Sequence, residues 1–147
     1  MNRLLLGIIA AALLAGCAGG PRDPVVCNDP PIPALAMVYP EPGATNVPDA
    51  LSTIVFSGEP AADDEMSIEL SIGDQKIAST GTFGPAPSPL PSPAGTPLPG
   101  EPPSYFAIAV NSLSPHTTYD VTYQYTLPGS GQCAGTVNLP EGSFTTQ

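Results

Sequence analysis

The chain has 147 residues, of which 21 are proline, 15 are glycine and 3 are lysine or arginine. Its formal net charge of -10 at pH 7 argues against a nucleic-acid partner and against attachment to an anionic membrane through a basic patch. The length is sufficient for one domain with a hydrophobic core.

The first predicted element is a short apolar segment that ends at a cysteine. Residues 4 to 14 carry almost no polar side chain, and Arg3 precedes them. The segment is too short to span a bilayer as a helix, which needs about 20 residues. A basic start, an apolar middle and small residues at the exit are typical of a cleaved export signal.

The end of this segment, Leu14-Ala15-Gly16-Cys17, resembles the lipobox of bacterial lipoproteins. The resemblance implies a signal peptide over residues 1–16 and a mature protein that begins at an acylated Cys17, carrying palmitate or similar chains. It also implies a lipid anchor in the bacterial cell envelope, on the outer membrane if the organism has one, facing the periplasm or the surface. The alternatives are an ordinary export signal with an incidental cysteine, and a buried apolar helix that carries a small thiol.

Residues 17–33 are predicted to be the lipidated cysteine and a tether, followed by a domain over residues 34–147. Export places Cys27 and Cys133 in an oxidising compartment, and two cysteines allow one intramolecular disulfide. We therefore predict a bond between Cys27 and Cys133. Two unpaired thiols, or intermolecular bonds, are the alternative.

The domain shows the alternation expected of short strands. Met66, Ile68, Leu70 and Ile72 alternate with polar residues, and the turn residues after them predict a hairpin partner near residues 76–78. Other expected strands place apolar residues on one face: Ile54 and Phe56; Phe106, Ile108 and Val110; Tyr119, Val121, Tyr123 and Tyr125; Val137, Leu139 and Phe144. The spacing predicts an all-β antiparallel sandwich of about seven strands.

Residues 85–103 form a proline-rich insertion in this domain, with nine prolines. Proline lacks a backbone donor and has a fixed φ, so the segment cannot join the interior of a sheet. We expect an extended, solvated loop that acts as a spacer. A ligand for aromatic grooves is the alternative.

Two segments of the domain resemble known protein families in their residues as well as in their hydrophobic pattern. Residues 39–60 resemble the opening of bacterial Ig-like domains of surface-layer and adhesin proteins, with Gly58 as an inserted residue. Leu113, Pro115 and Tyr119 match the Leu-x-Pro-x-x-x-Tyr signature of fibronectin type III domains. This resemblance implies an Ig-like or fibronectin type III-like fold in which Tyr119 forms a tyrosine corner. It implies no particular activity.

Catalytic and metal-binding residues are sparse. Hydrolytic catalysis needs convergent titratable groups, and the chain has one histidine, His116, so we predict no enzyme and no cofactor. The acidic residues Glu59, Asp63, Asp64 and Glu65 are weak calcium candidates. A solvated acidic loop is the favoured interpretation because their spacing matches no calcium-binding loop.

A periplasmic copper carrier is a further alternative. Such carriers share the Ig-like opening and bind copper through histidine and methionine, for which this chain offers His116, Met37 and Met66. Met66 lies on the apolar face of its predicted strand, where core packing is the simpler interpretation.

The predicted function is a lipid-anchored, non-catalytic module of the cell envelope that contacts protein or glycan. Tryptophan is absent and four of the five tyrosines fall in predicted strands, which weakens sugar binding without excluding it. The alternatives are a carrier of copper or calcium, and a structural spacer.

Overall fold

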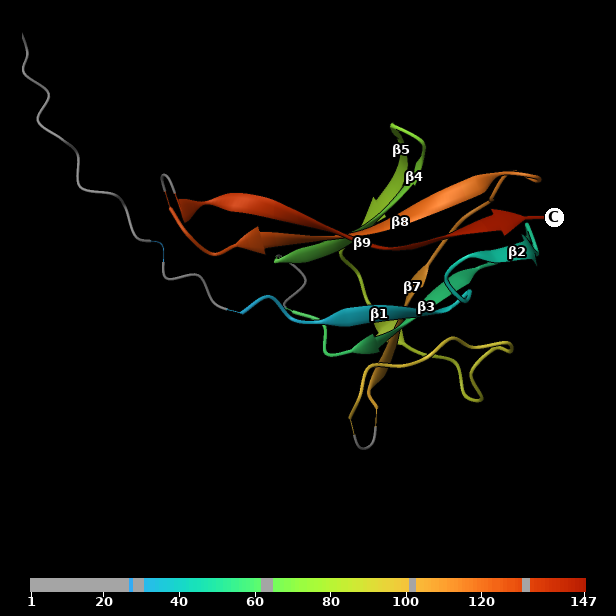
Figure 1. Ribbon diagram of the computed structural model, residues 1–147, viewed down its shortest axis with the longest axis horizontal. Coiled ribbons are helices and arrows are strands. Elements are labelled where there is room, and N and C mark those ends of the chain that lie inside the picture. The colour runs from blue at the N-terminus through green and yellow to red at the C-terminus, as the bar shows by residue number, and fades with distance from the viewer. Residues whose placement is uncertain (1–26, 28–30, 62–64, 101–102, 131–132) are drawn as a thin grey trace, which may run out of the picture.

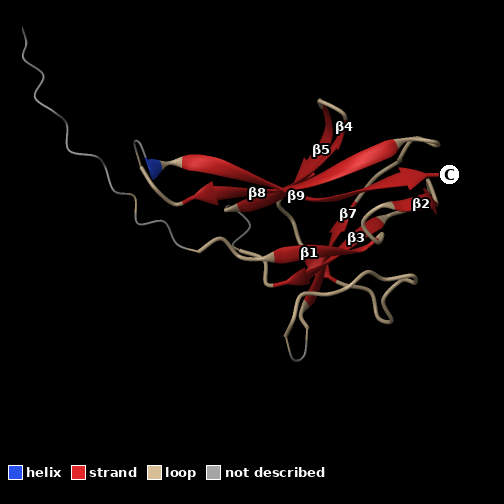
Figure 2. Ribbon diagram, viewed as in Figure 1, coloured by secondary structure: helices blue, strands red, loops and turns tan. Residues whose placement is uncertain are grey.

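The computed structural model describes residues 27, 31–61, 65–100, 103–130 and 133–147 (Figure 1). These residues form strands joined by loops, with one short helical turn at Cys133, and the strands are arranged in two β-sheets (Figure 2). The prediction of an all-β sandwich is therefore confirmed. The predicted signal peptide, Cys17 and most of the tether lie outside the described residues.

The first sheet has four antiparallel strands in the order β1-β3-β7-β6. In that order they are β1 (Leu35–Tyr39), β3 (Thr53–Gly58), β7 (Tyr105–Ala109) and β6 (Gly84–Pro85). The second sheet has five strands in the order β2-β9-β8-β4-β5. In that order they are β2 (Ala44–Val47), β9 (Gly135–Thr146), β8 (Thr118–Leu127), β4 (Met66–Ile72) and β5 (Gln75–Thr80).

The chain changes sheet between β1 and β2. β1 pairs antiparallel with β3 in the first sheet, whereas β2 pairs parallel with β9 in the second. The turn between them contains Gly43, whose φ of 83° lies in the region that favours glycine. This crossing links the two layers at one side of the sandwich.

The predicted apolar faces fill the space between the sheets. Met66, Ile68 and Leu70 of β4 are at most 3% exposed, as the alternation in the sequence required. Aromatic rings lie at the centre: Phe56 stacks on Phe106, with ring centroids 5.5 Å apart. A second pair, Tyr119 and Phe144, also stacks at 5.5 Å, across β8 and β9.

Among the described residues the chain forms nine strands, where about seven were expected, and two of them were not predicted from the sequence. β2 has four residues without apolar alternation, and β6 has two residues at the start of the proline-rich insertion. β6 pairs with β7 on one side and lies at the edge of the first sheet, a position that tolerates Pro85.

The prediction that residues 85–103 form a solvated spacer is wrong in one respect. The outer face of the first sheet carries a second buried cluster formed by Val38, Val55 and Ala107. Ala86 and Leu90 of the insertion pack against this cluster. The insertion therefore covers the sheet, because an apolar outer face exposed to water would be unfavourable.

Two hydrogen bonds fasten the insertion to the sheet. The backbone N–H of Gly95 donates to the carbonyl oxygen of Val38 over 2.7 Å, and that of Leu98 donates to Ser57 Oγ over 2.8 Å. Ser57 is fully buried, so the loop also satisfies a polar group that it removes from water.

Gly58 has a structural reason to be glycine. Its φ is 123°, and a Cβ atom added there would lie 2.5 Å from the carbonyl oxygen of Ala34. Any other residue would force these backbones apart. The residue inserted into the Ig-like opening thus lets β3 end against the segment that enters β1.

Candidate functional site

The two domain cysteines lie together. The sulfur atoms of Cys27 and Cys133 are 2.04 Å apart and their Cα atoms are 5.5 Å apart, in agreement with the predicted pairing. Cys133 lies in the connection between β8 and β9, so the bond holds the start of the domain at the end of this hairpin (Figure 1).

Tyr119 makes the contact that the fibronectin-like signature implied. Its hydroxyl oxygen accepts a hydrogen bond from the backbone N–H of Ser114 over 2.7 Å, and the ring is 1% exposed. Leu113 packs against the main core. Leu113 and Pro115 lie in the connection before β8 (Thr118–Leu127), and Tyr119 lies near its start.

The acidic candidates for calcium are only partly described. Glu59 is exposed just after β3, and Glu65 is partly exposed before β4. Asp63 and Asp64 lie outside the described residues. Within the described ranges, no group of three or more histidine, cysteine, aspartate or glutamate side chains gathers as a metal site would require.

The residues considered for copper occupy different environments. Met37 and Met66 are 2% and 3% exposed within the core. The sulfur of Met66 also accepts a hydrogen bond from the backbone N–H of Ala61 over 3.0 Å. His116 is exposed in the loop between β7 and β8, where its φ is 51°. Both methionine side chains therefore pack within the core, where the sequence placed Met66.

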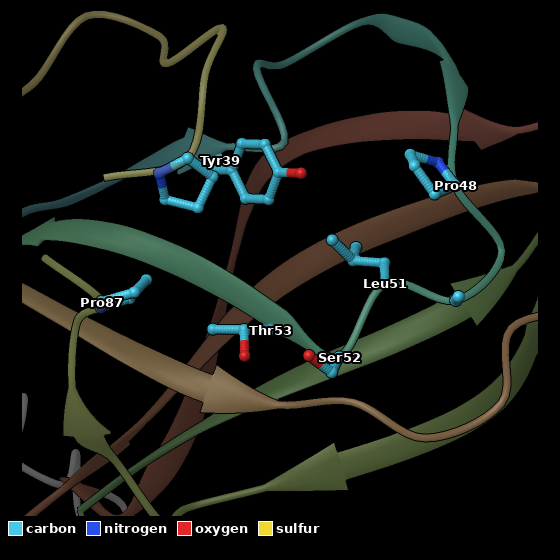
Figure 3. A pocket seen from close by; sticks show the side chains of 8 residues that line it. Tyr39, Pro48, Leu51, Ser52, Thr53 and Pro87 are labelled. Carbon is cyan, nitrogen blue, oxygen red and sulfur yellow. The ribbon is translucent and has the colours of Figure 1, made fainter. Parts of the chain in front are cut away.

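A groove runs beside the proline-rich insertion. Its central hollow, of about 350 Å³, lies between Tyr39 at the end of β1, the loop from Pro48 to Thr53, and Pro87 and Pro91 of the insertion. Figure 3 shows Tyr39 at one side of this hollow, with its hydroxyl directed toward the side where Pro48 and Leu51 lie.

Two further hollows adjoin the central one. A hollow of about 270 Å³ shares Tyr39 and Pro48 with it and is also lined by polar residues: Thr45, Asn46, Ser92 and Gln147. A hollow of about 390 Å³ shares Thr53 and Pro87 with the central one and is also lined by Phe83 and the end of β7. We call the three hollows together the Tyr39 groove.

The Tyr39 groove is almost uncharged. In the part of the chain that the structure describes, Glu41 is the one charged side chain that lines it. The groove therefore differs from the acidic chain as a whole, whose formal net charge is -10.

The groove also contains aromatic side chains that pack against the core and remain partly exposed. All nine phenylalanine and tyrosine residues of the chain are described, and six are buried: Phe56, Phe106, Phe144, Tyr119, Tyr123 and Tyr125. The other three, Tyr39, Phe83 and Tyr105, are partly exposed. Tyr39 and Phe83 both line the groove.

A titratable group lies at a separate place, where β9 approaches β1. Glu141 is an extra residue in β9, since Val121 pairs with Gly142 and Thr122 with Pro140. It lines a hollow of about 310 Å³ together with Met37, Glu41 and Gly95 among others. Burial raises the pKa of Glu141 to about 7, although a hydrogen bond from the Met37 backbone acts in the opposite direction.

The hydroxyl of Tyr123 is buried without a hydrogen-bond partner among the described residues. Burial, with smaller contributions from Tyr125, Glu141 and Glu65, raises its pKa to about 12. The phenol therefore stays neutral at physiological pH.

Comparison of the chain with known protein families, with curated proteins and with solved structures finds no match. Within the described ranges, no helix has the length and apolar character needed to cross a membrane.

Sequence reasoning missed the Tyr39 groove and Glu141. Nothing in the local sequence around Tyr39 predicts which loops meet it. Glu141 carried a usable signal, because Pro140-Glu141-Gly142 interrupts the alternation between Leu139 and Phe144 and so indicates a bulge.

Proposed function

We propose that the protein is a lipid-anchored, non-catalytic module of the bacterial cell envelope, built on an Ig-like, fibronectin type III-like sandwich, which contacts protein or glycan. The anchor rests on the lipobox-like residues before Cys17. The contact surface is the Tyr39 groove, which is the observation that carries the proposal.

The strand order supports the Ig-like assignment. Sheets of this class have the orders A-B-E-D and G-F-C-C′. The first sheet follows one order as β1-β3-β7-β6, and β9-β8-β4-β5 follows the other in the second sheet. The hydrogen bond between Ser114 and Tyr119 agrees with the tyrosine corner of the same class.

The groove supports a role in contact. Three segments, namely the end of β1, the loop after β2 and the proline-rich insertion, meet there around one aromatic ring. Concave sites lined by aromatic and apolar groups with a few polar side chains are typical of binding sites. Function in such sandwiches resides in the loops that the scaffold positions.

Two measurements test the proposal. Labelling the producing bacterium with an alkyne fatty acid should modify the protein, and Cys17→Ser should abolish the label. In-cell cross-linking with mass spectrometry should join the groove to an envelope component. Absence of lipid on Cys17 contradicts the anchor, and stoichiometric copper or calcium in the purified mature protein supports a carrier instead.

A further inference from the structure

We propose that the Tyr39 groove binds an uncharged, linear glycan whose sugar rings stack on Tyr39. This inference rests on the proposed contact function and specifies its ligand. It follows from where the partly exposed aromatic rings lie, which polar groups stand beside them, and which charged side chains are missing from the lining of the described groove.

The shape of the groove fits a chain. The central hollow shares residues with each of the other two, whereas the outer hollows share no lining residue with one another. The three hollows therefore form a row in space with the central one in the middle, and a row of this kind suits several linked sugars. Tyr39 lines both the central hollow and the polar one, so its partly exposed side chain lies where two of the hollows meet.

The polar hollow supplies the hydrogen bonds that a sugar requires. Hydroxyl groups of sugars both donate and accept, as do the side chains of Thr45, Asn46 and Ser92. None of these three side chains has a hydrogen bond within the described structure. Gln147 is oriented by a 3.0 Å hydrogen bond from its Nε2 to the carbonyl oxygen of Asn46, which leaves its Oε1 to accept.

The charged side chains that line the groove disfavour anionic ligands. No lysine or arginine lines it in the described part of the chain, and Glu41 repels anions. Phosphorylated or acidic glycans would thus lack a counterion, while carboxylates commonly accept hydrogen bonds from neutral hydroxyls. The complementary ligand is therefore uncharged.

A proline-rich peptide is the principal competitor. Grooves that recognise such peptides present several aromatic side chains along their length. Here the central and polar hollows contain one aromatic ring, Tyr39, and their other walls include Pro48, Pro87 and Pro91, which have no backbone donor. A ring beside free hydroxyl and amide groups suits a sugar better.

The walls of the groove are also held in place by the fold. Proline fixes φ, and the insertion is fastened to the first sheet through Gly95 and Leu98. A preformed groove loses little conformational freedom on binding. The proline-rich insertion would thus shape the groove as well as cover the sheet.

The test is an NMR titration of the mature protein carrying Cys17→Ser, with cellohexaose, chitohexaose and maltohexaose as probes. We expect at least one probe to shift the resonances of Tyr39, Asn46 and Thr53. Tyr39→Ala should weaken binding about tenfold or more, and Tyr39→Phe should retain most of it. Tyr105→Ala, at a partly exposed tyrosine outside the groove, should leave the affinity unchanged.

Tyr39 also packs against both core clusters, so Tyr39→Ala can disturb the fold. Asn46→Gly is the second variant, because Asn46 has a φ of 62°, which glycine adopts freely. It removes one amide from the polar hollow and should weaken binding severalfold without loss of structure.

Three results would overturn the inference: no shift with any probe at about 10 mM, binding unaffected by both variants, or competition of decaproline for the same resonances. If cross-linking in cells still identifies an envelope protein at the groove, the contact function stands and the glycan assignment fails. If a probe binds but Cys17 carries no lipid, the glycan assignment stands and the anchored module fails.

Discussion

Two tyrosines on the inner face of β8 have opposite hydrogen-bond situations. The hydroxyl of Tyr119 accepts a hydrogen bond from Ser114, whereas that of Tyr123 is buried without a partner among the described residues. Removing a satisfied bond destabilises, while removing a buried unsatisfied group stabilises or is neutral.

Substitution of each tyrosine by phenylalanine distinguishes a hydroxyl that has a hydrogen bond from one that has none. We expect Tyr119→Phe to lower the free energy of unfolding by about 1 kcal/mol, and Tyr123→Phe to raise it by up to about 1 kcal/mol. Urea denaturation of both variants at one pH measures the difference. A destabilised Tyr123→Phe variant would show that the hydroxyl has a partner, such as a bound water.

Glu141 makes stability depend on pH in an unusual direction. Its pKa in the folded protein is about 7, above its ordinary value of 4.5, so folding favours the protonated carboxyl. This stabilisation is complete below the unfolded pKa and is lost as pH rises through the folded pKa. The window therefore runs from about 4.5 to about 7.

Glu141→Gln should remove this dependence. We expect the variant to match the parent at pH 4 and to exceed its free energy of unfolding by about 1 kcal/mol at pH 8, a figure reduced because solvent reaches the carboxyl. Denaturation at several pH values measures it. Glu41→Gln, at an exposed carboxylate lining the same hollow, is the matched control and should leave the slope in place.

At the scale of elements, the proline-rich insertion belongs to the packing of the first sheet. Leu90 contacts the cluster of Val38, Val55 and Ala107, while Ala94 of the same loop is exposed. We expect Leu90→Ala to lower the free energy of unfolding by about 1 kcal/mol, and Ala94→Ser to have no effect. Equal stability of the two variants would contradict the packing role.

Replacement of residues 86–100 by a short glycine-serine linker gives a stronger form of the same test. The outer cluster would then face water, so we expect binding of a hydrophobic dye and lower solubility along with lower stability. Such a deletion cannot by itself distinguish a recognition loop from a spacer, because it also uncovers the sheet.

Strand β5, at one edge of the second sheet, is protected against pairing with a strand of another molecule. β5 lies at the edge of the second sheet, where Ile77 is an extra residue opposite the pairs Leu70–Ala78 and Ser71–Lys76. Lys76 forms a 2.7 Å ion pair with Glu69. A bulge and a lysine on an edge strand are common devices against strand addition. The 46% exposure of Ile77 is thus a weak basis for a docking site.

The sequence predicted the inner faces of the sheets better than their outer faces. Alternation in β4 and β8 identified Met66, Ile68, Tyr119 and Tyr123 as core residues, because a side-chain period of two is a local property. The cover on β3 was missed although the run Ile54-Val55-Phe56 indicates a strand buried on both faces.

The groove depends on contacts that no local pattern contains. Tyr39 and Pro87 lie far apart in the sequence and meet because the insertion folds back over the first sheet. Residue types could therefore suggest an interaction module, but the place of its surface required the three-dimensional arrangement of the loops.

At the scale of the whole molecule, the bond between Cys27 and Cys133 connects positions 106 residues apart. The chain-entropy model gives about 4 to 5 kcal/mol for closing such a loop, as an upper figure. We expect the double variant Cys27→Ala/Cys133→Ala to lose up to this amount in denaturant unfolding, and reduction of the parent to reproduce the loss. Unchanged stability would mean that the thiols are free in solution.

The Cys27–Cys133 bond also determines which end of the sandwich lies nearer the membrane if Cys17 is lipidated. The start of the described chain lies at the end of the β8–β9 hairpin, and β2 and the C-terminal residue lie at the opposite end (Figure 1). β9 extends for 12 residues between them, which is about 40 Å at ~3.3 Å per residue. With lipid on Cys17, residues 18 to 26 reach at most ~30 Å from the membrane to Cys27.

The Tyr39 groove should therefore face away from the membrane. We expect a fluorescent amino acid at Ser130, in the hairpin end, to transfer energy strongly to acceptor-labelled lipids in vesicles carrying the lipidated protein. The same label at Asp49, beside the groove, should transfer much less, because transfer falls steeply over the length of the sandwich. Cys27→Ala/Cys133→Ala should reduce this contrast, since the hairpin end is then no longer held to the tether, and equal transfer from both positions in the parent would contradict the orientation.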